Sequence, residues 1–88
     1  MKINIRENSS TMTVEAHLLS IDQVTRKNTD IIVIKTDVGN FSNYKTLFEK
    51  QNLDVDNLNE GDTLKISYVI HKAKNNVEFK NFIAIVKI

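Results

Sequence analysis

The first stretch of the chain with a regular pattern is TMTVEAHLLS, residues 11–20, in which apolar and polar side chains alternate. A period of two puts its apolar members on one face, namely Met12, Val14, Ala16 and Leu18. This is the pattern of a half-buried strand. The polar segment QVTRKNTD (residues 23–30) then predicts a turn, and DIIVIKTD (residues 30–37) is a β-branched run suited to a central strand.

The pattern changes from strand to helix in the middle of the chain. Gly39-Asn40 in VGNF suits a tight turn that requires positive φ, and it leads into a third strand that begins at Phe41. In SNYKTLFEKQNL (residues 42–53) helical spacing brings together Tyr44, Leu47 and Phe48. We predict a short helix here, with Ser42 or Asn43 as its cap, and favour it over a strand that continues through Leu47.

Two further strands are predicted near the end of the chain. TLKISYVI (residues 63–70) places alternate apolar residues on one face, whereas the apolar residues of VEFKNFIAIVKI (residues 77–88) switch face between Phe79 and Phe82. That switch indicates a bulge or a strand buried on both sides. In the polar connection before these strands, Leu58 is expected to be buried. The first ten residues are read as a tail or an extra strand.

Three strands, a short helix and two strands predict an all-β fold with a small α contribution. The architecture that fits is a five-stranded Greek-key barrel with its helix between the third and fourth strands, the OB-fold, over residues 11–88. In such a barrel Phe48 and Tyr68 belong to the core, as do seven aliphatic residues: Val14, Ile32, Ile34, Leu47, Leu64, Ile66 and Ile83.

Four segments resemble a pattern found in small OB-fold single-stranded DNA-binding proteins of bacteria, phages and mobile elements. They are TDVGNF, YKTLFEKQNL, LNEGDTLKISY and KNFIAIVKI, all within residues 36–88, and the resemblance as a whole covers roughly residues 12–88. The resemblance implies a barrel that binds single strands without catalysis. It is weaker for function than for fold, because OB-folds also bind proteins and sugars.

Composition narrows the classes of function. The 88 residues fit one domain, with a net charge of +1 that neither requires nor excludes an anionic partner. The absence of cysteine excludes disulfides and thiolate metal sites. No apolar run approaches the roughly 20 residues of a membrane span, and the amino terminus lacks the apolar core of a signal peptide, so we expect a cytoplasmic protein with no membrane partner.

Catalytic and metal-binding patterns are missing from the sequence. His17 and His71 lie on different predicted strands, and neither belongs to a local nucleophile–base arrangement. The acidic segment DVDNLNEGD (residues 54–62) resembles a calcium loop, but Leu58 and Asn59 occupy the positions that require an oxygen ligand and a glycine. We therefore expect no enzyme activity, no metal site and no cofactor.

Basic and aromatic residues suggest a nucleic-acid groove instead. Arg26 and Lys27 fall in the first predicted loop, and Lys72, Lys74 and Asn75 in the last; in an OB barrel these loops flank one groove. Lysines attract phosphates, and exposed rings stack on bases. Phe41 and Phe79 are the rings expected to be exposed. The full set of candidate residues is Arg26, Lys27, Lys35, Phe41, Lys72, Lys74, Asn75, Phe79 and Lys80.

The leading hypothesis is binding of single-stranded DNA, or RNA, with little sequence preference, in the replication of a phage or mobile element. The alternative is an accessory or inhibitor domain that docks on a polymerase, a helicase or a host-defence protein. With an aromatic content of only 7% and no tryptophan, weak binding per domain is expected. Edge strands and the apolar end FIAIVKI also allow pairing between copies of the chain.

Overall fold

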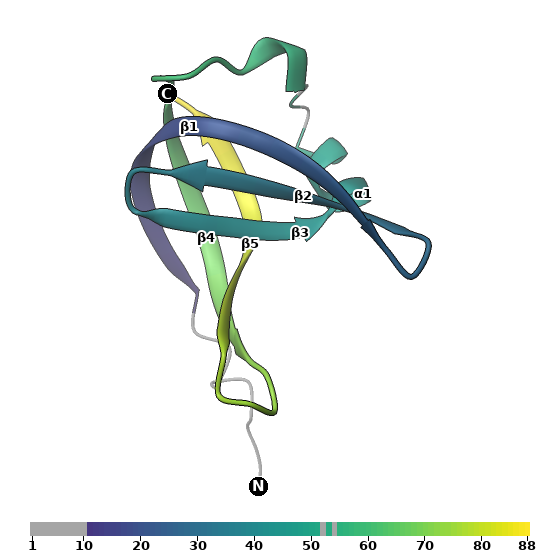
Figure 1. The fold of residues 1–88 in the computed structure, drawn as a ribbon. Helices are drawn as coiled ribbons and strands as arrows, with labels where there is room; N and C mark the ends of the chain where they lie inside the picture. The colour runs from purple at the N-terminus through teal and green to yellow at the C-terminus, as the bar shows by residue number, and fades with distance from the viewer. Residues whose placement is uncertain (1–10, 52, 54) are drawn as a thin grey trace, which may run out of the picture.

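Five strands form one sheet that closes on itself in a ring, in the order β1-β2-β3-β5-β4 (Figure 1). The computed structural model describes residues 11–51, 53 and 55–88; the predicted tail or extra strand at residues 1–10 lies outside them. The order of three strands, a short helix and two strands is confirmed. In chain order the elements are β1 (Met12–Arg26), β2 (Thr29–Thr36), β3 (Gly39–Tyr44), α1 (Lys45–Glu49), η2 (Val55–Asn57), β4 (Thr63–Lys72) and β5 (Glu78–Lys87).

The first strand is long enough to serve two neighbours. Its first half pairs with β4, from Met12 to His17, and its second half pairs with β2, from Leu18 to Arg26. Between the halves the register shifts and Leu19 has no partner in the ladder, as in a β-bulge. The segment 23–26, predicted as a turn, is therefore strand. Its side chains are exposed, and all but that of Val24 are polar, which explains why the segment looks like a turn in the sequence.

Two short turns connect the first three strands. Lys27 and Asn28 form the first turn, with φ of 51° and 64°, the left-handed pair that a two-residue hairpin favours. The second turn consists of Asp37 and Val38, two residues before the predicted Gly39-Asn40. Gly39 does carry the positive φ, at 129°, but it already lies in β3 opposite Thr36.

The predicted helix is present, but its predicted cap is not. The cap position of α1 is Tyr44, which makes no side-chain capping bond. Asn43 is used differently: its Oδ1 accepts a hydrogen bond from Tyr44 N at 2.8 Å, and its Nδ2 donates one to Phe82 O at 2.8 Å. The helix buries Phe48.

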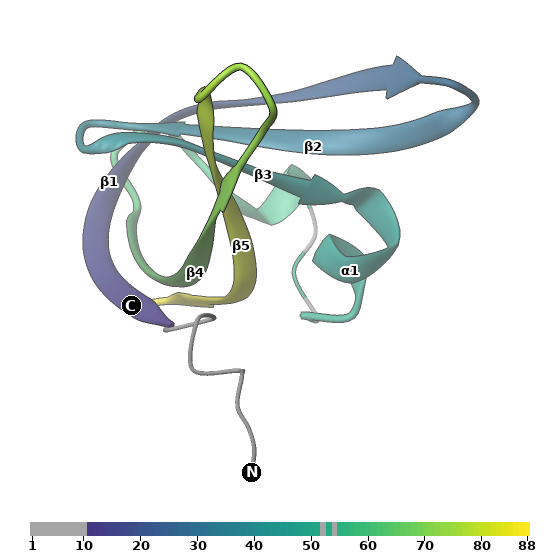
Figure 2. The same ribbon diagram turned by 90° about the horizontal axis from the view of Figure 1, so that it is seen from below.

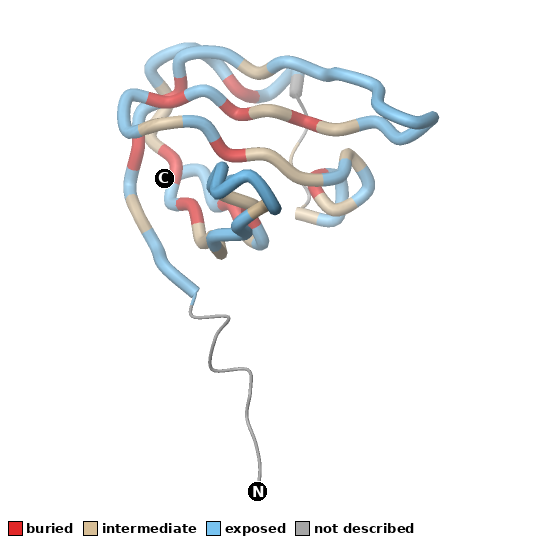
Figure 3. Tube along the Cα trace, turned by 60° about the horizontal axis from the view of Figure 1, so that its bottom comes forward, coloured by how far each residue is buried: buried red, intermediate tan, exposed pale blue. Residues whose placement is uncertain are grey.

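The core lies inside the ring (Figure 3). Burial is confirmed for Phe48, for Leu58 and for four of the seven predicted aliphatic residues, while Val14, Leu47 and Tyr68 are half-buried. The buried apolar residues are Ala16, Leu18, Ile32, Ile34, Phe41, Phe48, Leu58, Leu64, Ile66, Phe82 and Ile85.

Ile83 is the aliphatic residue whose predicted burial is wrong, since 39% of its surface is exposed. Ser67 pairs with Ala84 and Tyr68 with Phe82, so Ile83 is the extra residue of a bulge. The bulge turns both Phe82 and Ile85 inward, three positions apart. The strand does contain a bulge, one of the two alternatives read from the sequence, but it follows Phe82 instead of lying between Phe79 and Phe82, where the pairing is regular.

The ring closes between β3 and β5, where the backbone pairing is minimal. The register is parallel and has a single pair, Ser42 with Asn81. Two side-chain amides reinforce it: Asn81 Nδ2 donates to Ser42 O at 3.0 Å, and Asn43 Nδ2 donates to Phe82 O. We call this contact the β3–β5 seam (residues 42–43 and 81–82).

Two hairpins extend beyond the ring (Figures 1 and 2). We call them the β1–β2 arm (residues 24–31) and the β4–β5 arm (residues 69–80). Figure 2 shows that they run in different directions, with α1 beside the end of β3. Over the part of the chain that the structure describes, no helix is long and apolar enough to cross a membrane.

Candidate functional site

An open groove of about 500 Å³ lies between the two arms and the end of β3. This volume is within the range of about 300–1,000 Å³ that is typical of small-ligand sites. Both arms and the β3–β5 seam contribute to its lining. The lining residues are Arg26, Ile31, Ser42, Asn43, Tyr44, Val69, His71, Phe79 and Asn81.

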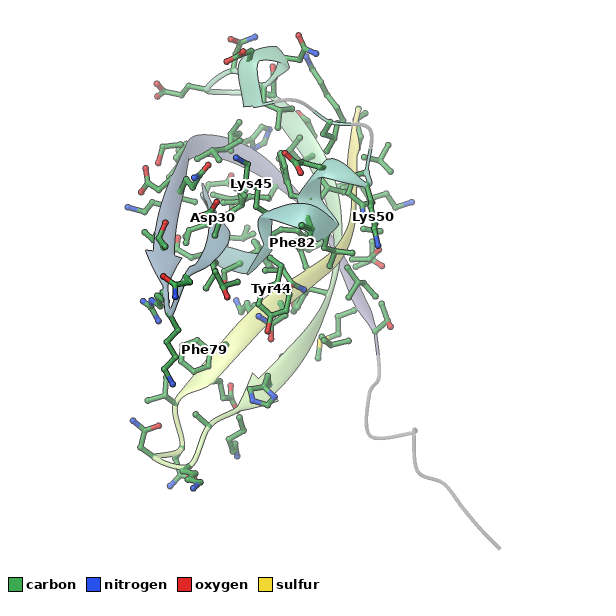
Figure 4. The ribbon with its side chains drawn as sticks, turned by 90° about the vertical axis from the view of Figure 1, so that its right-hand side faces the viewer. Asp30, Tyr44, Lys45, Lys50, Phe79 and Phe82 are labelled. Carbon is green, nitrogen blue, oxygen red and sulfur yellow. The ribbon has the colours of Figure 1, made fainter. Side chains whose placement is uncertain are left out.

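Two exposed aromatic rings line the groove. Tyr44 is 57% exposed and Phe79 is 42% exposed, and Figure 4 shows both on the same side of the molecule. Tyr44 is the last residue of β3 and pairs with Ile31, whose side chain lies on the outer face of β2. Phe79 pairs with His71 across the β4–β5 arm. The rings are therefore supported by different elements.

The polar groups of the groove are one permanent cation, the guanidinium of Arg26, and several further hydrogen-bonding groups. Arg26 comes from the end of β1, and His71 from the opposite arm. The bond that Asn81 Nδ2 donates to Ser42 O fixes the orientation of that amide, leaving its oxygen as an acceptor. None of the nine lining residues is acidic. A ligand with flat apolar faces and a negative charge would suit this lining.

The structure brings together only some of the predicted site residues. Arg26 and Phe79 line the groove. Four others are exposed at or near the tips of the two arms, outside the lining: Lys27, Lys72, Lys74 and Asn75. Lys72 Nζ lies 4.0 Å from Glu78 Oε2, and Asn75 Oδ1 accepts a bond from Val77 N. Lys35 Nζ forms an exposed ion pair with Asp22 Oδ2 at 2.9 Å.

The prediction that Phe41 is exposed is wrong. Only 1% of it is exposed, and its ring contacts the Tyr68 ring at a centroid distance of 5.0 Å. Phe41 pairs with Ile34, and paired residues in a hairpin share a face, so it lies on the buried side of β2. Because side chains alternate between the two faces along each strand, the sequence already places Phe41 on the same face as Ile34, and its burial could have been predicted.

Lys80 also lies away from the groove, although it is adjacent to Phe79. Its Nζ lies 5.5 Å from the centroid of the Phe41 ring and 5.9 Å from that of Tyr68. Successive residues of a strand point to opposite faces, so a residue next to Phe79 points inward over the core. Lys80 therefore has a cation–π role at the end of the core.

Sequence reasoning missed most of the groove lining. The sequence pattern groups Tyr44 with Leu47 and Phe48 on one helical face, but as the cap residue it is in extended conformation and outside the helix. Asn81 offered only a weak signal, an asparagine before a core phenylalanine. The sequence presents His71 only as a potential catalyst, and its position across the groove from Arg26 depends on how the two arms are arranged.

A second hollow of about 390 Å³ adjoins the groove at Tyr44, which lines both. Its charged residues are Asp30, Lys45 and Glu49, a formal sum of −1 from two carboxylates and one ammonium group. The other lining residues are Asn28, Thr29 and Thr46. We call it the acidic hollow. In the view of Figure 4, Tyr44 lies between Phe79 on one side and Asp30 with Lys45 on the other.

Among the described residues, two carboxyl groups have clearly shifted pKa values, and neither lines the groove. The backbone N–H of His17, followed by its side chain, lowers the pKa of Asp37 below its ordinary 3.8. The pKa of Asp62 is lowered chiefly by the backbone N–H of Asn59, with help from Lys87. Both carboxylates fix turns, which is a structural role.

Within the described part of the chain, no group of three or more His, Cys, Asp or Glu side chains could hold a metal ion. Comparison with known protein families, curated proteins and solved structures finds no significant match to this chain.

Proposed function

We propose that this protein binds single-stranded DNA non-catalytically, with little sequence preference, in the groove between the two arms. We also propose that the ring is an OB-fold. What supports the fold is the strand order with its parallel β3–β5 contact, and the helix between β3 and β4. A role in replication of a phage or mobile element fits such a binder.

The observation that carries the proposal is the pair of exposed rings, Tyr44 and Phe79, facing one groove from two elements. Burying exposed aromatic surface against a base is favourable whatever the base, because each base has a π face. Stacking contributes about 1–3 kcal/mol per base. Two rings therefore support binding of modest strength and little sequence preference.

The electrostatics support the same ligand more weakly. Arg26 lines the groove, where its guanidinium group would attract a phosphate, and the exposed lysines at the arm tips add a positive field. The net charge of only +1 limits long-range attraction. We expect affinity to depend more on stacking than on ion release.

Fluorescence anisotropy with labelled single strands at low and moderate salt tests the proposal. Tyr44→Ala and Phe79→Ala should each weaken binding by about 1–3 kcal/mol, with little dependence on salt. Val86→Ala is a matched control, because Val86 is exposed on β5 but does not line the groove. If the parent protein shows no affinity for single strands even at low salt, the proposal falls.

A protein ligand is the second candidate, favoured by the composition of the lining. Ile31, Val69 and the two rings give the groove an apolar surface, and Arg26 is the single fixed charge among its nine residues. A peptide with an aromatic or aliphatic anchor would fit that surface. This reading predicts no binding of single strands, with loss of partner binding when Tyr44 is replaced by Ala.

A further inference from the structure

The groove differs sharply on the two sides of Tyr44. On the Phe79 side the lining has no carboxylate and includes Arg26. On the other side lies the acidic hollow, in which Asp30 and Glu49 outnumber Lys45. A backbone of phosphates that passed over Tyr44 in both directions would therefore meet attraction on one side and repulsion on the other.

We propose that the groove binds the end of a single strand, with the terminal base stacked on Tyr44. The backbone then runs past Phe79 along the β4–β5 arm, and no phosphate occupies the acidic hollow. This inference rests on the proposed function, because it specifies which part of a single strand the same groove takes.

The charges along the β4–β5 arm support the direction of the strand. Lys72 and Lys74 are exposed near its tip and outnumber Glu78 there. A strand that leaves Tyr44 past Phe79 thus approaches two ammonium groups and one carboxylate, whereas one that leaves in the other direction approaches two carboxylates and one ammonium group. The difference favours one direction even though each exposed charge acts weakly.

The polar groups of the acidic hollow suit a terminal hydroxyl better than a phosphate. Thr29, Thr46 and Asn28 offer neutral hydrogen-bonding groups beside the carboxylates. A carboxylate accepts a bond from a hydroxyl and repels a phosphate dianion. A strand end with a free hydroxyl is therefore the form that we expect to bind.

The test compares a linear oligonucleotide, with hydroxyl groups at both ends, with a covalently closed circle of the same sequence. The circle should be long enough to be unstrained. We expect the linear strand to bind about fivefold more tightly at low salt, which corresponds to about 1 kcal/mol. Equal affinities for the two would overturn the proposal. Absence of binding by both would instead overturn the proposed function.

Glu49→Gln isolates the contribution of the acidic hollow. Removing this charge should strengthen binding of the circle and of a strand with a phosphate at each end, and should change binding of the hydroxyl-ended strand little. Glu60→Gln is the matched control, since Glu60 is exposed in the connection before β4 and lines neither hollow. If Glu49→Gln leaves the difference between linear and circular strands unchanged, the acidic hollow does not select ends.

Discussion

Gly39 directly follows the turn between β2 and β3, and its φ of 129° lies in a region that side chains other than glycine rarely adopt. A Cβ atom at this position would lie 3.1 Å from Lys80 Nζ, the ammonium group placed over the Phe41 and Tyr68 rings. We expect Gly39→Ala to lower the free energy of unfolding by about 1 kcal/mol or more. Urea denaturation measures this change.

A double-mutant cycle separates the two causes. In a Lys80→Ala background the contact is gone, so Gly39→Ala should cost only the backbone strain. Val38→Ala, at the neighbouring exposed position, serves as control and should change the free energy of unfolding by less than about 0.5 kcal/mol. A Gly39→Ala variant as stable as the parent would show that this φ is not required.

Asp37 gives the folded state a defined pH dependence. Its Oδ1 accepts a bond from His17 N at 2.8 Å, and its Oδ2 lies 2.9 Å from His17 Nδ1. The pKa of Asp37 is lowered in the folded state, so near pH 3.8 the unfolded chain binds more protons. The stability from this carboxylate is present above that pH and is lost as the pH falls through the folded pKa. Melting temperatures from about pH 5 down to about pH 2 should therefore fall less for Asp37→Asn than for the parent.

His17→Ala is the informative comparison for that measurement. The backbone N–H of His17 is the largest cause of the lowered pKa of Asp37, and the variant retains it. The melting temperature of His17→Ala should thus fall with acid almost as much as that of the parent, whereas the melting temperature of Asp37→Asn should fall less. Identical profiles for the parent and Asp37→Asn would contradict this account.

At the scale of elements, the β3–β5 seam depends on side chains to an unusual degree. Because backbone pairing is limited to Ser42 with Asn81, the amides of Asn43 and Asn81 complete the closure. Replacing either by Ala should cost about 1–2 kcal/mol, since each loss leaves a partly buried carbonyl without its donor. Asn40→Ala, on the exposed part of β3, is the control. The losses of unfolding free energy for the two seam variants, measured by urea denaturation, should not add up in the double variant, because both act on the same closure. Additive losses would argue against a common seam.

The bulge in β5 leads us to predict very different stability effects for substitutions at two adjacent residues, Phe82 and Ile83. Ile83 is exposed, and Gln51 Nε2 contacts only its backbone oxygen, at 3.4 Å. Ile83→Thr should therefore change stability by less than about 0.5 kcal/mol. Phe82→Ala should cost about 3 kcal/mol or more, because it opens a cavity beside the Phe48 ring. Thermal denaturation of the two variants checks this. If Ile83→Thr lowered stability more than Phe82→Ala, the bulge would have to lie elsewhere in the strand.

Strand and helix periods could be read from the sequence because they depend on local alternation. Ile32, Ile34, Leu64 and Ile66 are buried as predicted for this reason. The exposure of Ile83 could not be assigned, because a bulge is visible only as a change of face and not as a particular residue. The position of the turn at Asp37 depended on a partner twenty positions away, His17.

At the scale of the whole molecule, the groove exists because two arms and a seam converge. Arg26, Tyr44 and Phe79 come from three different strands, and no pattern in the sequence relates them. The sequence did predict that the first and last hairpins carry basic residues. The sequence could not show that the basic residues at the arm tips lie outside the groove lining, because the length of each arm depends on where strand pairing ends.

The cations of the groove and of the arm tips should differ in their effect on salt dependence. For a single strand, each phosphate contact contributes a slope of roughly 0.7 to log affinity against log salt. Arg26→Ala should flatten the slope by about this amount for short and long strands alike, since it lines the groove. Lys72→Ala with Lys74→Ala should leave the slope unchanged for a dinucleotide and flatten it only for strands long enough to reach the tip. Circular dichroism of the variants checks that the fold is retained. If the double lysine variant flattens the slope for the dinucleotide as well, the strand lies along the arm tips and the assignment of the groove is wrong.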